Sequence, residues 1–196
     1  VSTREATCIT SRNARLDYFV VCADTSMLIE SAQVSDMCIV GDAFARPLVE
    51  HLDANPELRD ITCLRNVSSS GMVWSADVKA RLLVYAPDAI LIDFLNSSEA
   101  SGMGRSISSK RAANGRPQTG SRFQLGKNAF IIDDEGRAME PGDKRVGRLA
   151  ARGYIPLGYY KDPKKTAETF PVINGVRCSI PGDFARLLAD GSVDLL

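Results

Sequence analysis

Apolar runs alternate with helical patterns through the first half of the chain. Short apolar runs predict buried strands at 37–40, 61–67 and 88–95. Between them, apolar positions three and four residues apart predict helices over 44–54 and from Ser75 on, with Ser75 as the N-cap. Strand, helix, strand, helix, strand implies parallel neighbours joined by right-handed crossovers. The pattern therefore predicts an α/β layer of parallel strands covered by helices.

The loops after these three strands carry small and polar residues. They are Gly-Asp-Ala-Phe at 41–44, Ser-Ser-Ser-Gly-Met at 68–72 and Asn-Ser-Ser-Glu-Ala-Ser-Gly at 96–102. Because the carboxyl ends of parallel strands gather at one sheet edge, we expect the three loops to form a ligand crevice there. Loops favour such residues in any case, so ordinary loop chemistry is the alternative explanation.

The segments on either side of this layer have weaker patterns. We expect a short strand at 18–22 and a helix at 25–34. Residues 103–122 carry five basic side chains but no apolar periodicity, which favours a solvated loop or linker over a nucleic-acid surface. The predicted division is an α/β part at 1–105, a linker loop at 106–122 and a β-rich part at 123–196.

From residue 123 on, the pattern predicts mostly strands. The clearest strand is 146–152, where Val, Arg and Ala alternate with Gly, Leu and Ala. Asn-Gly at 174–175 is typical of a type I′ hairpin turn, and Asp-Gly at 190–191 repeats the signal. One short helix interrupts the strands, with Asp162 as its N-cap and Pro163 at its first position.

Composition indicates a soluble globular protein with a substantial core. The 196 residues are 44% hydrophobic, and 24 basic residues balance 24 acidic ones, so the charge does not favour nucleic acid as a partner. No apolar run approaches the roughly 20 residues that a membrane helix needs, and the start does not resemble a signal peptide. The five cysteines are odd in number and scattered, which is typical of reduced residues in a cytoplasmic protein.

Two short polar motifs are candidates for chemistry. Ser98 and Glu99 follow the strand at 88–95 after two intervening residues, Asn96 and Ser97. Ser98 offers a hydroxyl for phosphate oxygens, and Glu99 offers a hard ligand for Mg²⁺. Asp183 follows a Pro-Gly turn, and one carboxylate can accept both hydroxyls of a ribose. From spacing alone, the plainer interpretation of the first motif is a helix cap or loop, and that of Asp183 is a turn residue.

Four motifs occur in order along the chain. They are Ser-Ser-Gly-Met-Val-Trp-Ser at 69–75, Ser-Ser-Glu-Ala at 97–100, Gly-Tyr-Tyr-Lys-Asp-Pro at 158–163 and Ile-Pro-Gly-Asp at 180–183. Together they resemble the adenylate-forming (AMP-binding) superfamily, and most closely its bacterial fatty-acyl-CoA synthetase branch. The resemblance covers about residues 37–196. It implies the middle and late part of the family's large N-terminal domain, a partial parallel-sheet layer followed by a β-rich, distorted-barrel subdomain that ends before the hinge.

The resemblance implies a two-step ligase. A carboxylate attacks the α-phosphorus of ATP and releases pyrophosphate, and the thiol of coenzyme A then displaces AMP to give a thioester. The implied ligands are ATP or AMP, Mg²⁺, coenzyme A and a small carboxylic acid, with a fatty acid as the first choice and a sterol side chain or an aryl acid as alternatives. Catalysis of this kind depends on positioning and on charge stabilisation.

The resemblance also implies roles for single residues. Ser98 would contact the phosphate and Glu99 would hold Mg²⁺, and these two are the predicted catalytic residues. Gly71 and Met72 would border the adenine and the acyl channel through their backbone. Asp183 would bind the ribose.

Three positions depart from the family's pattern. Leu95 and Asn96 would border the nucleotide, but Leu95 stands where the family commonly has an aromatic ring stacked on adenine, and Asn96 replaces the usual glycine. Cys178 stands where a tyrosine is common. These differences weaken the match to a tight nucleotide site.

The sequence also lacks two features of the family. One is the Ser/Thr/Gly-rich phosphate loop that ends in Lys-Gly, and the other is the catalytic lysine of the mobile carboxyl domain. We therefore expect the chain to be a piece of a larger ligase, inactive by itself and able to self-associate through uncovered apolar surface. The alternative is a non-catalytic binding or assembly module.

Overall fold

The structure, a computed structural model, describes residues 7–11, 14–18, 24–57, 60–110 and 122–196. These residues form two compact units. Unit 1 contains the described residues up to Asp93 together with 107–110, and unit 2 contains 94–106 and 122–196. The predicted division at residues 105 and 122 stays a prediction.

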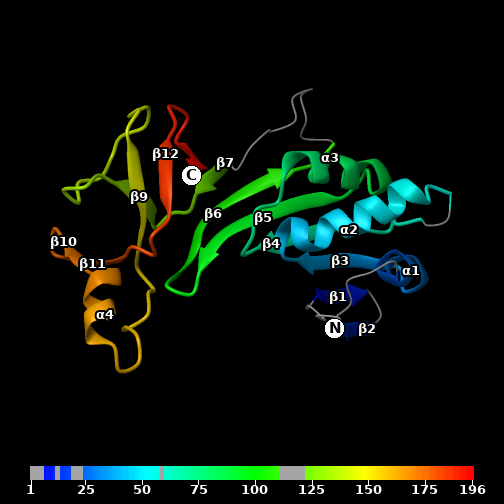
Figure 1. Ribbon diagram of the computed structural model, residues 1–196, viewed down its shortest axis with the longest axis horizontal. Coiled ribbons are helices and arrows are strands. Elements are labelled where there is room, and N and C mark those ends of the chain that lie inside the picture. Colours follow the sequence, from blue (N-terminus) through cyan, green and yellow to red (C-terminus); the bar gives the residue numbers. More distant parts are fainter. Residues whose placement is uncertain (1–6, 12–13, 19–23, 58–59, 111–121) are drawn as a thin grey trace. The chain divides into compact units, whose positions relative to one another are not determined.

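Unit 1 combines a sheet with helices (Figure 1). Its strands lie in the order β2–β1–β3–β4–β5, and α2 and α3 lie side by side over the sheet. β3 and β4 are parallel, as predicted, whereas β1 runs antiparallel to β3. In chain order the elements are β1 (Thr7–Ser11), β2 (Ala14–Tyr18), α1 (Asp24–Ser31), β3 (Val34–Ile39), α2 (Gly41–Ala54), β4 (Asn66–Ser70), α3 (Ala76–Tyr85) and β5 (Ile90–Ser97).

The core of unit 1 forms where the helices meet the sheet. Phe44, Leu48 and Leu52 are four residues apart on α2 and are all buried, so this helix turns one apolar stripe inward. Leu82 of α3 and Leu91 of β5 join the same cluster. None of the helices that the structure describes is long and apolar enough to span a bilayer.

Two elements of unit 1 begin elsewhere than predicted. α2 begins at Gly41 and not at residue 44, which places Pro47 inside the helix and not in its first turn. β4 begins only at Asn66, because Ile61 and Leu64 are buried in a turn that is closed by a 3.1 Å hydrogen bond from the Leu64 amide to the Ile61 carbonyl. The predicted strand at 18–22 lies, apart from Tyr18 at the end of β2, outside the described residues.

Unit 2 is mostly strands. Its order is β5–β6–β7–β13–β12–β9–β11–β10, and β8 also pairs with β9. The pairings recorded among β6 to β13 are antiparallel. Its further elements are β6 (Ala100–Ser108), β7 (Arg122–Leu125), β8 (Ala129–Ile132), β9 (Val146–Arg152), α4 (Pro163–Thr169), β10 (Val172–Ile173), β11 (Val176–Ser179), β12 (Phe184–Leu187) and β13 (Ser192–Leu195).

Locally encoded features of unit 2 are confirmed. β9 spans the predicted 146–152. Asn174 and Gly175 have φ of 50° and 80°, as a type I′ turn requires. Asp162 caps α4 by accepting a hydrogen bond from the Lys165 amide at 2.9 Å. The predicted α/β layer followed by a β-rich part is therefore correct.

Two predictions about the chain after residue 102 are wrong. Residues 103–108, expected at the start of a solvated loop or linker, belong to β6. The Asp-Gly at 190–191 closes a four-residue loop between β12 and β13 in which only Gly191 has a positive φ, so the turn is not a type I′ hairpin.

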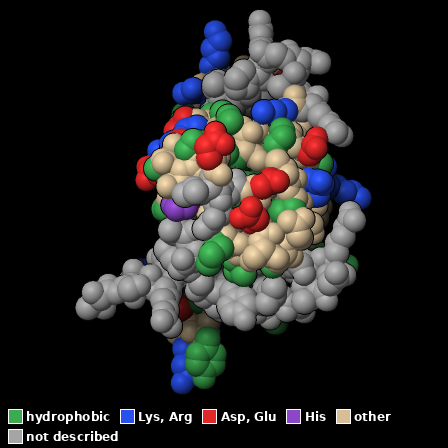
Figure 2. All heavy atoms as spheres, turned by 90° about the vertical axis from the view of Figure 1, so that its right-hand side faces the viewer, with side chains coloured by type: hydrophobic (Ala, Val, Ile, Leu, Met, Phe, Trp, Pro, Cys, Tyr) green, Lys and Arg blue, Asp and Glu red, His purple; other side chains and the backbone are tan. Residues whose placement is uncertain are grey.

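Figure 2 shows acidic and basic side chains interspersed on the face that it presents, in keeping with the balanced charge.

Candidate functional site

The Ser-Ser-Glu motif forms the tip of a β-hairpin. β5 continues to Ser97 and β6 begins at Ala100, so the predicted loop at 96–102 reduces to the two residues Ser98 and Glu99. The Ser97 hydroxyl oxygen accepts from the Ala100 amide at 3.1 Å, and the Asn96 side-chain oxygen accepts from the Gly102 amide at 2.6 Å. The turn is thus fixed by its own side chains, and Ser98 is exposed at its tip.

The Glu99 carboxylate is held from across unit 2 by Tyr159. The Tyr159 hydroxyl donates to Glu99 Oε1 at 2.6 Å, sixty residues away in sequence. This hydrogen bond lowers the pKa of Glu99, because it stabilises the ionised carboxylate more than partial burial disfavours it. The same bond raises the pKa of Tyr159. Glu99 is therefore an ionised, oriented carboxylate at neutral pH.

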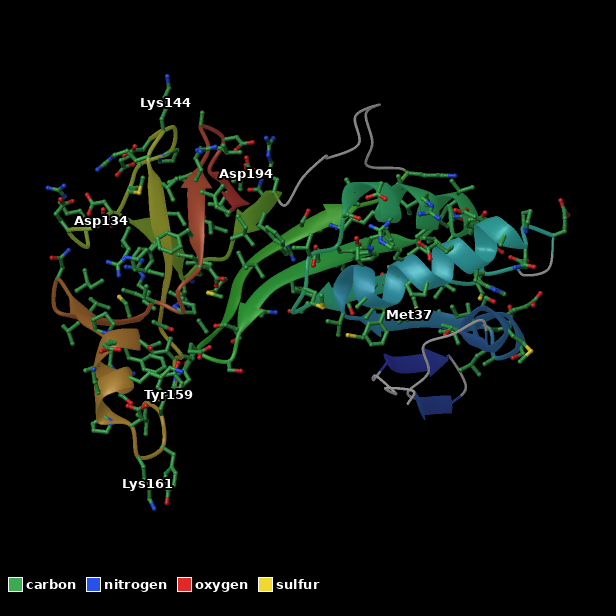
Figure 3. The ribbon with its side chains drawn as sticks, viewed as in Figure 1. Met37, Asp134, Lys144, Tyr159, Lys161 and Asp194 are labelled. Carbon is green, nitrogen blue, oxygen red and sulfur yellow. The ribbon has the colours of Figure 1, made fainter. Side chains whose placement is uncertain are left out.

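Tyr159 is itself positioned by α4 (Figure 3). Its amide donates to the Thr166 hydroxyl oxygen at 2.9 Å, and its ring lies 5.7 Å from that of Phe170, centroid to centroid. The Lys165 ammonium lies 4.6 Å from the Tyr159 ring centroid, within the range of a cation–π contact. Sequence reasoning used Tyr159 only as part of a motif and missed this role, since no local pattern identifies a partner so distant in sequence.

Asp183 is exposed on a backbone that is tied down. Its carbonyl accepts from the Leu149 amide of β9 at 2.9 Å, and Gly182 before it has φ of 113°, a conformation that L residues rarely adopt. Its carboxylate has no recorded hydrogen bond or ion pair with another described residue. The carboxylate can therefore accept hydrogen bonds from the hydroxyls of a ligand.

Leu95 has a packing role in the structure. It is 8% exposed and lies in the core of unit 2 with Met103 and Phe123, whereas its neighbours Phe94 and Asn96 are exposed. Strand alternation explains this, because successive side chains point to opposite faces. A nucleotide contact by Leu95 or Asn96 stays a prediction, and the geometry favours packing for the first and turn support for the second.

Gly71 and Met72 belong to unit 1, at the edge where β3 and β4 end. The Gly41 amide donates to the Ser69 hydroxyl oxygen at 2.9 Å, and the Asp42 amide donates to the Val73 carbonyl at 3.0 Å. The residues 41–44, predicted as a loop, are thus the first turn of α2, and this turn lies beside the end of β4 and the loop after it. Met72 is 56% exposed beside them.

No group of three or more metal-ligating side chains is found in the part of the chain that the structure describes. Within unit 2 the predicted residues Ser98 and Glu99 are neighbours, and Tyr159 joins them.

A scan against protein-family models found no match. Curated relatives do match. The chain is 43% identical over 173 residues to a medium/long-chain-fatty-acid–CoA/3-oxocholest-4-en-26-oate–CoA ligase of Mycolicibacterium smegmatis, covering 86% of this chain and 30% of the relative. It is 40% identical over 174 residues to the medium-chain acyl-CoA ligase Mig of Mycobacterium avium, covering 88% of this chain and 30% of that one. The chain belongs to the adenylate-forming superfamily.

Solved adenylate-forming structures share the fold. A nonribosomal peptide synthetase, FmoA3, bound to α-methyl-L-serine-AMP superposes with a TM-score of 0.74 at 22% identity, over 92% of this chain and 21% of that one. The Vibrio cholerae adenylation domain AlmE, in complex with glycyl-adenosine-5′-phosphate, gives a TM-score of 0.69 at 17% identity, over 89% and 33%. The chain spans about 30% of the length of the curated relatives named above.

Proposed function

We propose that this chain is part of an ATP-dependent acyl-CoA ligase that activates a carboxylic acid, with a fatty acid as the first choice. The observation that carries the proposal is the Glu99 carboxylate at the tip of the β5–β6 hairpin, which is oriented by a hydrogen bond from Tyr159 that also lowers its pKa. Identity of 43% to a relative named as a fatty-acid–CoA ligase supports the same reaction class.

In the proposed reaction the chain's residues bind and position ATP. Ser98 contacts a phosphate oxygen, Glu99 lies beside the charged phosphates, and Asp183 accepts the ribose hydroxyls. Gly71 and Met72 border the adenine and the acyl channel through their backbone. The carboxylic acid then attacks the α-phosphorus and pyrophosphate leaves, after which the coenzyme A thiol displaces AMP. Such a site accelerates the reaction by positioning and by stabilising charge that develops in the transition state.

The donor set at Glu99 fits a magnesium ion. A carboxylate offers two oxygens and about four lone-pair directions, so the hydrogen bond from Tyr159 to Oε1 does not exhaust it. Mg²⁺ in nucleotide enzymes is commonly held by one or two carboxylates together with substrate phosphates and water. A bound Mg²⁺ would offset the negative charge of the triphosphate, and Glu99 would be the protein ligand.

Two substitutions, made in the full-length protein that the gene encodes, test the proposal. Asp183→Ala removes the acceptor for the ribose hydroxyls and should weaken ATP binding about ten- to a hundredfold, the usual worth of hydrogen bonds to a charged group. Glu99→Ala removes a group that acts mainly in the transition state, so the adenylation rate should fall by roughly two orders of magnitude with a smaller change in ATP affinity. Isothermal titration with ATP and pyrophosphate exchange measure the two effects.

Asp134→Ala, in an exposed turn of unit 2, is the matched control and should change neither quantity. If Asp183→Ala lowers only the melting temperature and leaves the ATP dissociation constant unchanged, Asp183 is a turn residue and the nucleotide role is lost. If no carboxylic acid supports pyrophosphate exchange in the wild-type protein, the chain is part of a binding or assembly module.

A further inference from the structure

Unit 2 contains a cavity that none of the residues proposed for ATP line. Its volume is about 280 Å³, and its walls come from the turn before β8, from β8 and β9, and from the β10–β11 hairpin. Pockets for drug-sized ligands measure roughly 300–1,000 Å³, so this one suits a smaller molecule, of about one ring or a short branched chain.

The walls of the cavity are mostly apolar. Phe130 and Ile173 form one part of them, and Val176 and Cys178 of β11 form another. Burial raises the pKa of the Cys178 thiol although Arg152 opposes the shift, so the sulfur stays protonated and neutral at physiological pH. Cys178 is 2% exposed and contributes wall surface, not a nucleophile.

The charged side chains that line the cavity are both cations. Lys127 and Arg152 have no recorded ion pair with a carboxylate among the described residues. Arg152 lies opposite Cys178 in the β9–β11 pairing, and its guanidinium carbon lies 5.9 Å from the Phe130 ring centroid. A guanidinium held against a ring is partly ordered in advance, and its planar fork matches a carboxylate in two parallel hydrogen bonds.

Amide groups complete the polar part of the lining. Asn128 lines the cavity, and the Arg152 amide donates to the Asn128 carbonyl at 3.0 Å. Asn174 lines the cavity from a type I′ turn whose positive φ values fix its position. Side-chain amides can both donate to an anion and accept from a hydroxyl.

From these walls we propose that the cavity binds a small organic carboxylate, with its apolar body against Phe130, Ile173 and Val176 and its carboxylate between Arg152 and Lys127. Two cations without partner carboxylates explain the preference for an anion, and the apolar walls explain the need for a hydrocarbon body. The inference does not rest on the proposed ligase activity, because it uses only the charges and walls of this cavity.

The test uses benzoate as the probe and follows the backbone amides of the ¹⁵N-labelled full chain by NMR. Benzoate should shift amides in 127–130, Arg152 and 173–178, with a dissociation constant of about a millimolar, as expected for a ligand with so few atoms. Two control ligands should each bind at least about tenfold more weakly than benzoate. Benzyl alcohol keeps the ring but lacks the charge, and inorganic phosphate keeps a charge but lacks the ring.

Variants then assign the binding to the two cations. Arg152→Gln should weaken benzoate about tenfold or more, and Lys127→Gln, at an exposed position that leaves the fold intact, should weaken it severalfold. Lys144→Gln is the matched control, since Lys144 is an exposed cation before β9 that does not line the cavity (Figure 3).

The inference is overturned if benzoate shifts none of these amides, if benzyl alcohol binds as tightly as benzoate, or if Lys127→Gln and Arg152→Gln bind like Lys144→Gln. Equal binding of inorganic phosphate and benzoate would likewise overturn it, since the apolar walls would then contribute nothing. Shifts confined to other amides would place the carboxylate elsewhere and have the same consequence.

Discussion

At the scale of single residues, the hydrogen bond from the Tyr159 hydroxyl lowers the pKa of Glu99. Tyr159→Phe keeps the ring against Phe170 and removes the donor, so the pKa of Glu99 should rise toward that of an ordinary glutamate. A carboxylate with a higher pKa is protonated at higher pH, and the acid limb of the adenylation rate should therefore move to higher pH. The measurement is a pH–rate profile of the variant against wild type.

Tyr160→Phe is the control for this substitution, because Tyr160 is 87% exposed and its hydroxyl has no hydrogen bond to another residue that the structure describes. Superimposable profiles for Tyr159→Phe and wild type would show that the Tyr159–Glu99 bond does not affect the step that is measured.

A second residue-scale feature is the buried ion pair of unit 1. Lys79 Nζ lies 3.1 Å from Asp93 Oδ2, both residues are at most 6% exposed, and the Lys79 ammonium lies 5.3 Å from the Trp74 ring centroid. Lys79→Met would leave a buried carboxylate without its cation, which typically costs about 3–5 kcal/mol of unfolding free energy. The double variant Lys79→Met/Asp93→Asn removes both charges and should recover most of that loss, as urea denaturation can show.

The pH dependence of this loss has a definite sign. Burial raises the pKa of Asp93 and Lys79 opposes that rise, so Lys79→Met should raise it further. A group whose folded pKa lies above its unfolded value stabilises the fold below the unfolded pKa, and that contribution is lost as pH rises through the folded pKa. The stability gap between Lys79→Met and wild type should accordingly narrow as the pH falls, and a gap that widens would contradict the assignment.

At the scale of elements, Asp42 joins the starts of α2 and α3. Its carboxylate accepts from the Ser75 amide at 2.9 Å, from the Ser75 hydroxyl at 2.7 Å and from Arg46 at 2.6 Å. Asp42→Ala should cost about 1.5–3 kcal/mol of unfolding free energy, the worth of hydrogen bonds to a charged group. Asp77→Ala, at an exposed position of α3, is the control and should cost less.

The ionisation of Asp42 determines the pH range in which its contribution to the free energy of unfolding is lost. Burial acts to raise the pKa of Asp42, but the hydrogen bonds from Ser75 and Arg46 outweigh it and the pKa is lowered. The stabilisation is therefore present above the pKa of an unfolded aspartate, about 3.9, and is lost as pH falls through the lower folded value. The melting temperatures of wild type and Asp42→Ala should therefore converge in that acidic range. A difference in melting temperature that stays constant down to low pH would contradict this account.

Elements with local determinants could be predicted from the sequence. The Asp162-Pro163 start of α4, the alternation of β9 and the Asn174-Gly175 turn each depend on neighbouring residues. The start of α2 and the length of β5 could not be predicted. The first depends on hydrogen bonds to Ser69 of β4 and to Val73 in the loop after it, and the second depends on pairing with β6. The Glu99–Tyr159 bond joins residues sixty positions apart and has no local signature.

At the scale of the whole molecule, the described residues contain separate hydrophobic cores in the two units. Leu82 is fully buried in the cluster of unit 1, and Leu149 is fully buried in a cluster of unit 2. Truncating such a leucine to alanine typically costs about 2–5 kcal/mol. If each core stabilises its own unit, Leu82→Ala should weaken unit 1 and Leu149→Ala should weaken unit 2.

Two probes can distinguish the units during urea unfolding. Trp74, the single tryptophan, lies in the cluster of unit 1, so its fluorescence reports on that unit, while hydrogen exchange of the β9 amides reports on unit 2. Leu82→Ala should lower the midpoint of the fluorescence transition with little change in β9 protection, and Leu149→Ala should do the reverse. If both variants shift both probes equally, the chain unfolds in one cooperative step, because β5, which runs from one unit into the other, couples the two cores.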